Sequence, residues 1–171
     1  VEFVLCIMSN VPAGTSEPSH PGDYLWDYES GLGDFVEVSW GTGDQGWISP
    51  LTGEVIENDH TGIWQYNFFI PEAEAFEQQE GTIYWLTVEV LVPTTFNGAF
   101  GWKTSISQHF EDDAAWIEIR DDVDILPWQE LLDPLTGESL DMAFVITPEP
   151  ATLAFLGLGA VGLVARRRRR K

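Results

Sequence analysis

The sequence has almost no cysteine and, outside its last residues, almost no positive charge. Cys6 is the only cysteine among 171 residues, so an internal disulfide is excluded; in the segment FVLCIM it is expected to be a small buried core residue. Residues 1–147 contain 27 of the 28 acidic residues but only Lys103 and Arg120 as bases, which gives them a net charge of −25. Such a surface repels phosphate backbones, so we expect no nucleic-acid partner.

Familiar catalytic motifs are also missing. The chain contains no Gly-x-Ser-x-Gly, no His-Glu-x-x-His and no phosphate-binding glycine loop. His20, His60 and His109 are too far apart in the sequence for a spaced metal motif. Carboxylates are so frequent that no pair is singled out for general acid/base chemistry. We therefore expect a non-enzymatic protein with no catalytic residues; a glycan hydrolase is the alternative that a close Asp/Glu pair across an open groove would favour.

Long helical patterns are rare in residues 1–147, where apolar residues instead alternate with a period of two. The segment FVEVSW places Val36, Val38 and Trp40 on one face of a strand, and IWQYNFFI places Trp64 on the face opposite the polar residues. Trp40, Trp64 and Trp85 therefore fall in strand registers that are expected to bury them.

Eight strands are predicted, separated by turn signals such as GTGDQG at residues 41–46. Only Pro71–Glu80 and Trp128–Leu132 permit a helix, and both are short. The predicted fold of residues 1–147 is all-β, an antiparallel β-sandwich that is jelly-roll-like or immunoglobulin-like. The expected strands are Glu2–Met8, Tyr24–Tyr28, Phe35–Trp40, Ile63–Ile70, Thr82–Val92, Phe100–Ser105, Ala115–Ile119 and Asp141–Ile146.

The pentapeptide PLTGE occurs twice, at Pro50–Glu54 and Pro134–Glu138. Little else aligns around the two copies, so an internal repeat is not indicated. We interpret them as two similar turns, each started by its proline and each with a glycine free to take a positive φ.

Two kinds of ligand site are worth considering in the β domain. Tryptophan stacks on sugars, which makes the loop-placed Trp47, Trp102 and Trp128 candidates for carbohydrate contact, with exopolysaccharide as a partner. No organic cofactor is expected, and calcium is the one ion that an acidic exported domain favours. No acidic cluster has the order of a calcium-binding loop, and solvated acidic loops are the competing explanation. The candidate calcium ligands are Asp112, Asp113, Asp121 and Asp122.

The last residues combine a short apolar stretch with a block of cations. Residues 151–165 contain Thr152 as their one polar residue and would span about 22 Å as a helix, at about 1.5 Å per residue. A hydrocarbon core is about 30 Å thick, so this transmembrane helix is marginal. The cations should remain on the cytoplasmic side and leave the N-terminal domain outside. The stop-transfer residues are Arg166, Arg167, Arg168, Arg169, Arg170 and Lys171.

The order of Pro148, Glu149 and Pro150, an apolar helix and a terminal arginine cluster resembles the PEP-CTERM sorting signal of exported bacterial proteins. The resemblance implies that an exosortase in the inner membrane recognises the Pro-Glu-Pro segment, cuts near it and passes the protein on to the cell surface or extracellular matrix. Residues 151–165 would then be a transient anchor, and the whole signal would cover residues 148–171.

A second likeness covers most of residues 24–147. The segments NGAFGWKTSISQHFEDDAAW, GTGDQGW and LDMAFVITPEP resemble an uncharacterised domain that recurs ahead of PEP-CTERM signals. It implies one β domain and no particular activity. Residues 1–147 are therefore expected to be one acidic β-sandwich ectodomain. Because Val1 already lies in a strand-like segment, we interpret the N-terminus as truncated.

Overall fold

The computed structural model describes residues 1–14, 18–31, 33–93, 95, 100–105, 114–120, 123–124 and 127–147. Every regular element in this part of the chain is a β-strand, and every strand pair is antiparallel. The predicted all-β antiparallel class is therefore confirmed. The predicted C-terminal helix lies outside the described residues.

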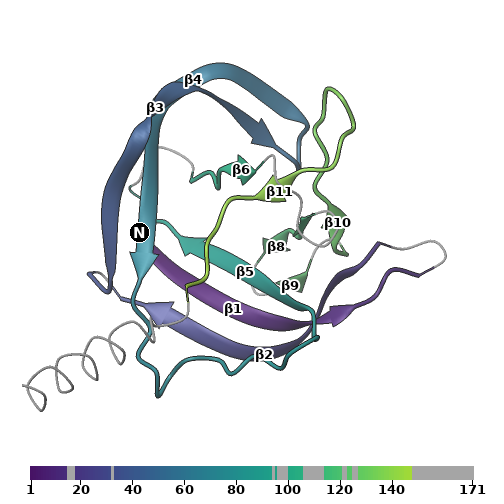
Figure 1. Cartoon of the computed structure of the whole chain (residues 1–171). Helices are drawn as coiled ribbons and strands as arrows, with labels where there is room; N and C mark the ends of the chain where they lie inside the picture. The colour runs from purple at the N-terminus through teal and green to yellow at the C-terminus, as the bar shows by residue number, and fades with distance from the viewer. Residues whose placement is uncertain are drawn as a thin grey trace, which may run out of the picture.

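The central sheet has three strands in the order β2-β1-β5, which Figure 1 shows across the lower half of the molecule. They are β1 (Glu2–Val11), β2 (His20–Ser30) and β5 (Tyr84–Leu91). Along β1, Phe3, Leu5 and Ile7 alternate with less buried residues, so one face of the sheet is buried. The strand expected at Glu2–Met8 is confirmed as part of β1.

A long hairpin curves over this sheet (Figure 1). Its strands are β3 (Phe35–Ser49) and β4 (Glu54–Phe68), paired from Phe35 opposite Phe68 to Ser49 opposite Glu54. The segment GTGDQG, predicted as a turn, instead lies inside β3, and the pairing register shifts three times between Ser39 and Trp47. Its glycines and short polar residues disfavour a regular strand, and here they are accommodated as bulges, which bend and twist a ladder.

Phe3 joins the sheet to the base of the hairpin. Its side chain is 2% exposed, and its ring centroid lies 5.1 Å from that of Phe35, 5.0 Å from Tyr66 and 5.2 Å from Phe68. Phe100 adds a further edge-on contact at 5.4 Å. Edge-to-face aromatic pairs add stabilisation beyond the area they bury. We call these five rings the aromatic cluster; it joins β1 of the central sheet to the base of the β3–β4 hairpin.

Tyr66 belongs to this cluster as a neutral ring. Burial raises the pKa of its hydroxyl, and the carboxylate of Glu37, its partner across the hairpin, raises that pKa further. The phenol therefore stays protonated at physiological pH and packs as an aromatic side chain.

Ser30 fixes the Phe3 backbone next to the cluster. Its hydroxyl accepts a hydrogen bond from the Phe3 N–H at 3.0 Å and donates one to the Phe3 carbonyl at 3.1 Å. Ser30 is itself buried, so both backbone groups are satisfied without water.

The prediction of which tryptophans are buried was partly wrong. Trp40 is 71% exposed and Trp64 is 54% exposed, and Val36 and Val38 are exposed beside Trp40 on β3. Successive side chains of a strand point to opposite faces, and it is Phe35 that packs against Phe3 of the central sheet. The face of β3 that carries Val36, Val38 and Trp40 therefore meets solvent. Trp85 is half-buried, and its indole N–H donates to the Asn10 side-chain oxygen at 2.7 Å.

The remaining strands form three two-residue ladders. Their pairs are β6 with β11, β7 with β10 and β8 with β9. Neither helix-permissive window is helical, since residues 71–75 form turns and β10 lies within the second window. The strand bounds are β6 (Thr104–Ser105), β7 (Ala115–Trp116), β8 (Ile119–Arg120), β9 (Val123–Asp124), β10 (Gln129–Glu130) and β11 (Asp141–Met142).

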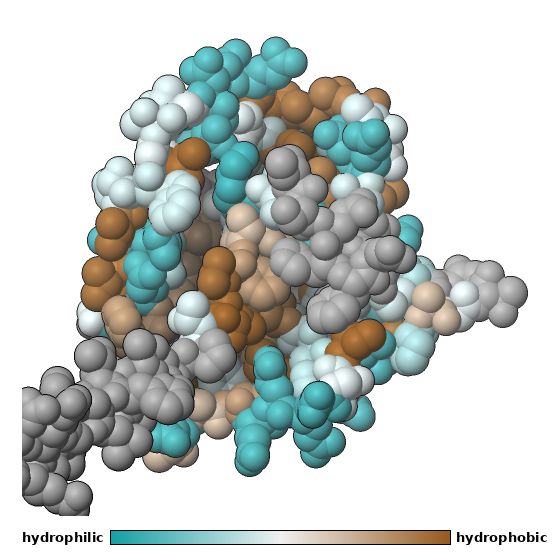
Figure 2. All heavy atoms as spheres, in the orientation of Figure 1, coloured by the Kyte–Doolittle hydropathy of each residue, from teal (hydrophilic) through white to brown (hydrophobic). Residues whose placement is uncertain are grey.

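The core of the described residues is small. Its buried apolar residues are Phe3, Leu5, Ile7, Pro21 and Ala114. Figure 2 shows apolar residues in the middle of one face and also at its upper and left edges, interspersed with hydrophilic residues. Because little apolar surface is fully buried, each core side chain should carry a large share of the stability.

We expect Phe3→Ala to lower the free energy of unfolding by about 3–5 kcal/mol, because it removes the ring at the centre of the aromatic cluster. Urea denaturation followed by tryptophan fluorescence measures this loss. Phe69→Ala is the matched control: that side chain is 72% exposed, and its loss should change stability by less than about 0.5 kcal/mol. Equal effects of the two substitutions would contradict this description of the core.

Candidate functional site

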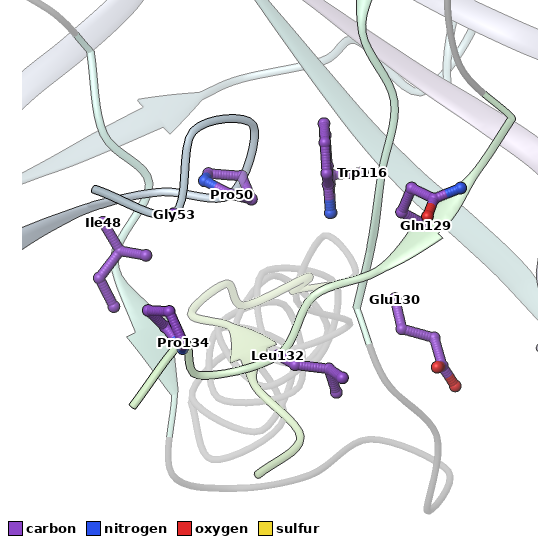
Figure 3. Close-up of a pocket in the computed structure, with 8 residues that line it drawn as sticks. All are labelled: Ile48, Pro50, Gly53, Trp116, Gln129, Glu130, Leu132 and Pro134. Atoms are coloured by element: carbon purple, nitrogen blue, oxygen red, sulfur yellow. The ribbon is translucent and has the colours of Figure 1, made fainter. Parts of the chain in front are cut away.

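A pocket of about 190 Å³ lies where the far end of the β3–β4 hairpin meets β7, β10 and the loop after β10. Trp116 and Gln129 are directly opposite each other in the β7–β10 pair, so their side chains share one face of that ladder. We call this the two-turn pocket, because both PLTGE segments contribute to it (Figure 3). Its lining residues are Ile48, Pro50, Gly53, Trp116, Gln129, Glu130, Leu132 and Pro134.

The first PLTGE segment forms the end of the hairpin. The N–H of Gly53 donates to the carbonyl of Ser49 at 2.8 Å, and Gly53 has a φ of 69°. The N–H of Glu54 donates to the Thr52 hydroxyl oxygen at 3.3 Å. A residue with a Cβ adopts this left-handed conformation only at a cost, so glycine is required at the position.

The second PLTGE segment repeats this geometry 84 positions later. The N–H of Gly137 donates to the carbonyl of Asp133 at 2.7 Å, and Gly137 has a φ of 72°. The N–H of Glu138 donates to the Thr136 hydroxyl oxygen at 3.2 Å. In addition, the Asp133 carboxylate accepts the N–H groups of Leu135 and Thr136. The prediction of two similar turns, each with a glycine at positive φ, is therefore confirmed.

The polar groups of the pocket come from β7 and β10. The Gln129 amide nitrogen donates to the carbonyls of Pro127 and Trp128, which orients the side chain. In Figure 3 the Trp116 ring lies between Pro50 and Gln129, with its indole nitrogen turned toward Pro134 and Leu132. Within the described part of the chain, no hydrogen-bond acceptor is paired with that indole N–H.

None of the three predicted tryptophans lines the two-turn pocket. The Trp47 ring packs on Gly101, where an added Cβ would lie 2.7 Å from the ring. The Trp102 indole N–H donates to the Ala143 carbonyl at 2.8 Å, and the ring meets Phe144 edge-on at 6.3 Å. Trp128 precedes β10 and is half-buried. Trp47 and Trp102 therefore have structural partners within the domain.

Trp116 is the aromatic residue that sequence reasoning missed. It follows the acidic segment EDD, and its place in a predicted strand gave no sign of a ligand site. The pairing of β7 with β10 brings it to Gln129, and that contact between distant segments is not visible in the sequence. The duplicated PLTGE pentapeptide was the one available signal.

The candidate calcium ligands Asp112, Asp113, Asp121 and Asp122 lie outside the described residues. Among the described residues, no group of three His, Cys, Asp or Glu side chains is placed to hold a metal ion. Calcium binding therefore remains a prediction.

Cys6, expected to be buried in the core, is half-buried and forms no disulfide. Its sulfur lies 3.9 Å from the Tyr24 hydroxyl.

Comparison with known protein families identifies the family to which the chain belongs. The profile of a domain of unknown function, DUF7901, matches residues 1–147. The chain belongs to the DUF7901 family. The profile of the PEP-CTERM protein-sorting motif matches residues 147–170, directly after the DUF7901 domain. No curated protein and no solved structure matched the chain significantly.

The PEP-CTERM signal establishes the destination of this DUF7901 protein. It is exported, passes through the inner membrane with processing by exosortase, a membrane protein, and is then anchored at the cell surface or released. Among the described residues, no helix is long and apolar enough to cross a membrane.

We expect Gly53→Ala and Gly137→Ala each to lower the free energy of unfolding by about 1–2 kcal/mol, because both glycines hold the left-handed conformation. Thermal or urea denaturation measures the two losses, which should be similar. Gly14→Ala is the control: an added Cβ there also meets open space, but the backbone is not left-handed, so stability should not fall. A neutral result at Gly53 or Gly137 would contradict the similarity of the turns.

Proposed function

We propose that residues 1–147 serve, after export, as a non-enzymatic domain of the cell surface or extracellular matrix. The observation that carries the proposal is the PEP-CTERM signal, which follows an acid-rich β domain without an intervening domain. The domain would be delivered to the outside of the cell by its C-terminal signal and would act there through its surface.

The charges of the chain support a specific course for the sorting step. The six cations at Arg166–Lys171 resist transfer across the bilayer and hold the C-terminus in the cytoplasm. Residues 151–165 would then lie in the membrane, with Pro148–Pro150 at the outer interface. An apolar segment of about 22 Å, shorter than the hydrocarbon core of about 30 Å, suits a transient anchor better than a permanent one.

The last contacts of the fold limit where processing takes place. The Ala143 N–H donates to the Lys103 carbonyl at 2.8 Å, and the Ala143 carbonyl accepts from Trp102. From Ala143 onward the described residues are exposed, and Val145 is 84% exposed. Four residue steps lead from Phe144 to Pro148 and span at most about 14 Å when fully extended. The folded domain would therefore lie close to the membrane surface while exosortase acts.

The charge of the domain restricts its partners at the surface. A net charge of −25 on residues 1–147 repels anionic lipids and polyanions. Uncharged glycans and cations are the partners that this surface favours, which supports exopolysaccharide as a partner. A carbohydrate-binding module is accordingly the second candidate function, and the two-turn pocket is the specific observation in its favour.

Replacing Pro148, Glu149 and Pro150 together by alanine should leave full-length protein in the inner membrane, because the recognition motif is lost. Cell fractionation and mass spectrometry of the C-terminus in native cells measure this outcome. Val145→Ala, which changes an exposed side chain just upstream, is the control and should be processed like the wild type. Release of the triple variant with the wild-type trimmed mass would overturn the sorting proposal.

A further inference from the structure

Two identical pentapeptides from distant parts of the chain meet at one pocket. Pro50 and Gly53 come from the first PLTGE segment and Pro134 from the second, and all three line the two-turn pocket. The sequence predicts two similar turns but not that they lie close together, so their meeting in space is a feature of the fold.

The rim that these turns provide is rigid. Each turn is closed by a hydrogen bond of 2.8 Å or less that the N–H of a left-handed glycine donates, and each begins with a proline whose φ is fixed by its ring. A rim that is ordered before a ligand arrives loses little conformational entropy on binding. The pocket therefore has the preorganised walls of a binding site.

The chemistry of the lining combines an aromatic face with hydrogen-bonding groups. Trp116 provides the ring, and its indole N–H has no hydrogen-bond partner within the described residues. Gln129 adds a side-chain oxygen, since its amide nitrogen already donates to two backbone carbonyls, while Ile48 and Leu132 add apolar surface. A sugar ring presents apolar C–H faces and polar hydroxyl edges, and this combination matches it.

The volume of the pocket and the charge of the domain restrict the class of ligand further. The volume of about 190 Å³ is below the range of about 300–1,000 Å³ that is usual for small-molecule pockets. One ring is therefore accommodated, and the rest of a polymer would extend into solvent. The Glu130 carboxylate and the −25 charge of the domain disfavour a uronate or a sulfated sugar.

We propose that the two-turn pocket is a subsite for one uncharged sugar unit of a polysaccharide. The sugar stacks on Trp116, and its hydroxyls pair with the indole N–H and the side-chain oxygen of Gln129. The proposal rests on the surface role proposed above, since it gives that role its ligand.

The test measures binding of the exported protein to immobilised neutral polysaccharides, with dextran and xylan as the probes and alginate as the uronate comparison. Wild-type protein should bind at least one neutral polymer and not alginate. Trp116→Ala should weaken that binding at least tenfold, and Trp116→Phe, which keeps a ring but loses the N–H, should fall between the two. Circular dichroism shows whether each variant is folded.

Trp40→Ala is the matched control, because Trp40 is the most exposed tryptophan of the hairpin and lies outside the pocket; its affinity should equal the wild type. Absence of neutral binding by the wild type, or a loss caused by Trp40→Ala and not by folded Trp116→Ala, would overturn the subsite. Mass spectrometry measures export and trimming independently of glycan binding. Correctly processed protein that binds no glycan would refute the subsite but not the proposed surface role.

Discussion

The packing of Phe3 against the base of the β3–β4 hairpin is the contact on which the rest of the described structure depends. Few side chains in the described part of the chain are fully buried, so the hairpin is held to the central sheet mainly through this aromatic cluster. The hairpin carries the first PLTGE turn at its other end, where Ser49 pairs with Glu54. The position of that turn against β7 and β10, and with it the shape of the two-turn pocket, is therefore set by packing at the far end of the same hairpin.

The division of charge along the chain fits a protein that works outside the cell after a membrane-bound step. Nearly all the acids lie in residues 1–147, and six of the eight bases lie in the last six residues. A charge of −25 keeps such a domain away from anionic surfaces and from other copies of itself, which favours solubility at a cost in self-repulsion. If exosortase removes the basic tail, as proposed, the mature domain keeps only its acidic character, and neutral polymers become the partners that its surface tolerates best.

The sequence predicted those features that depend on neighbouring residues. The apolar segment Glu2–Met8 predicted a strand, and the PLTGE pentapeptides predicted two turns with left-handed glycines. Features that depend on distant contacts were not predictable. The inward face of β3 is the one that carries Phe35, because Phe3 lies against it, and this exposes Trp40. Likewise, GTGDQG reads as a turn locally but is absorbed as bulges when β4 pairs with it, and Trp116 reaches the pocket only because β10 pairs with β7.

Amide hydrogen exchange followed by NMR tests most directly whether the aromatic cluster joins the two sheets into one unit. The account predicts that the amides of β1 and of the hairpin base, near Phe35 and Phe68, exchange slowly and with the same free energy of opening. The bulged part of β3 around residues 41–47 should exchange faster, because its ladder is interrupted. Unrelated opening free energies for β1 and the hairpin base, or a bulged segment as well protected as the base, would contradict the account.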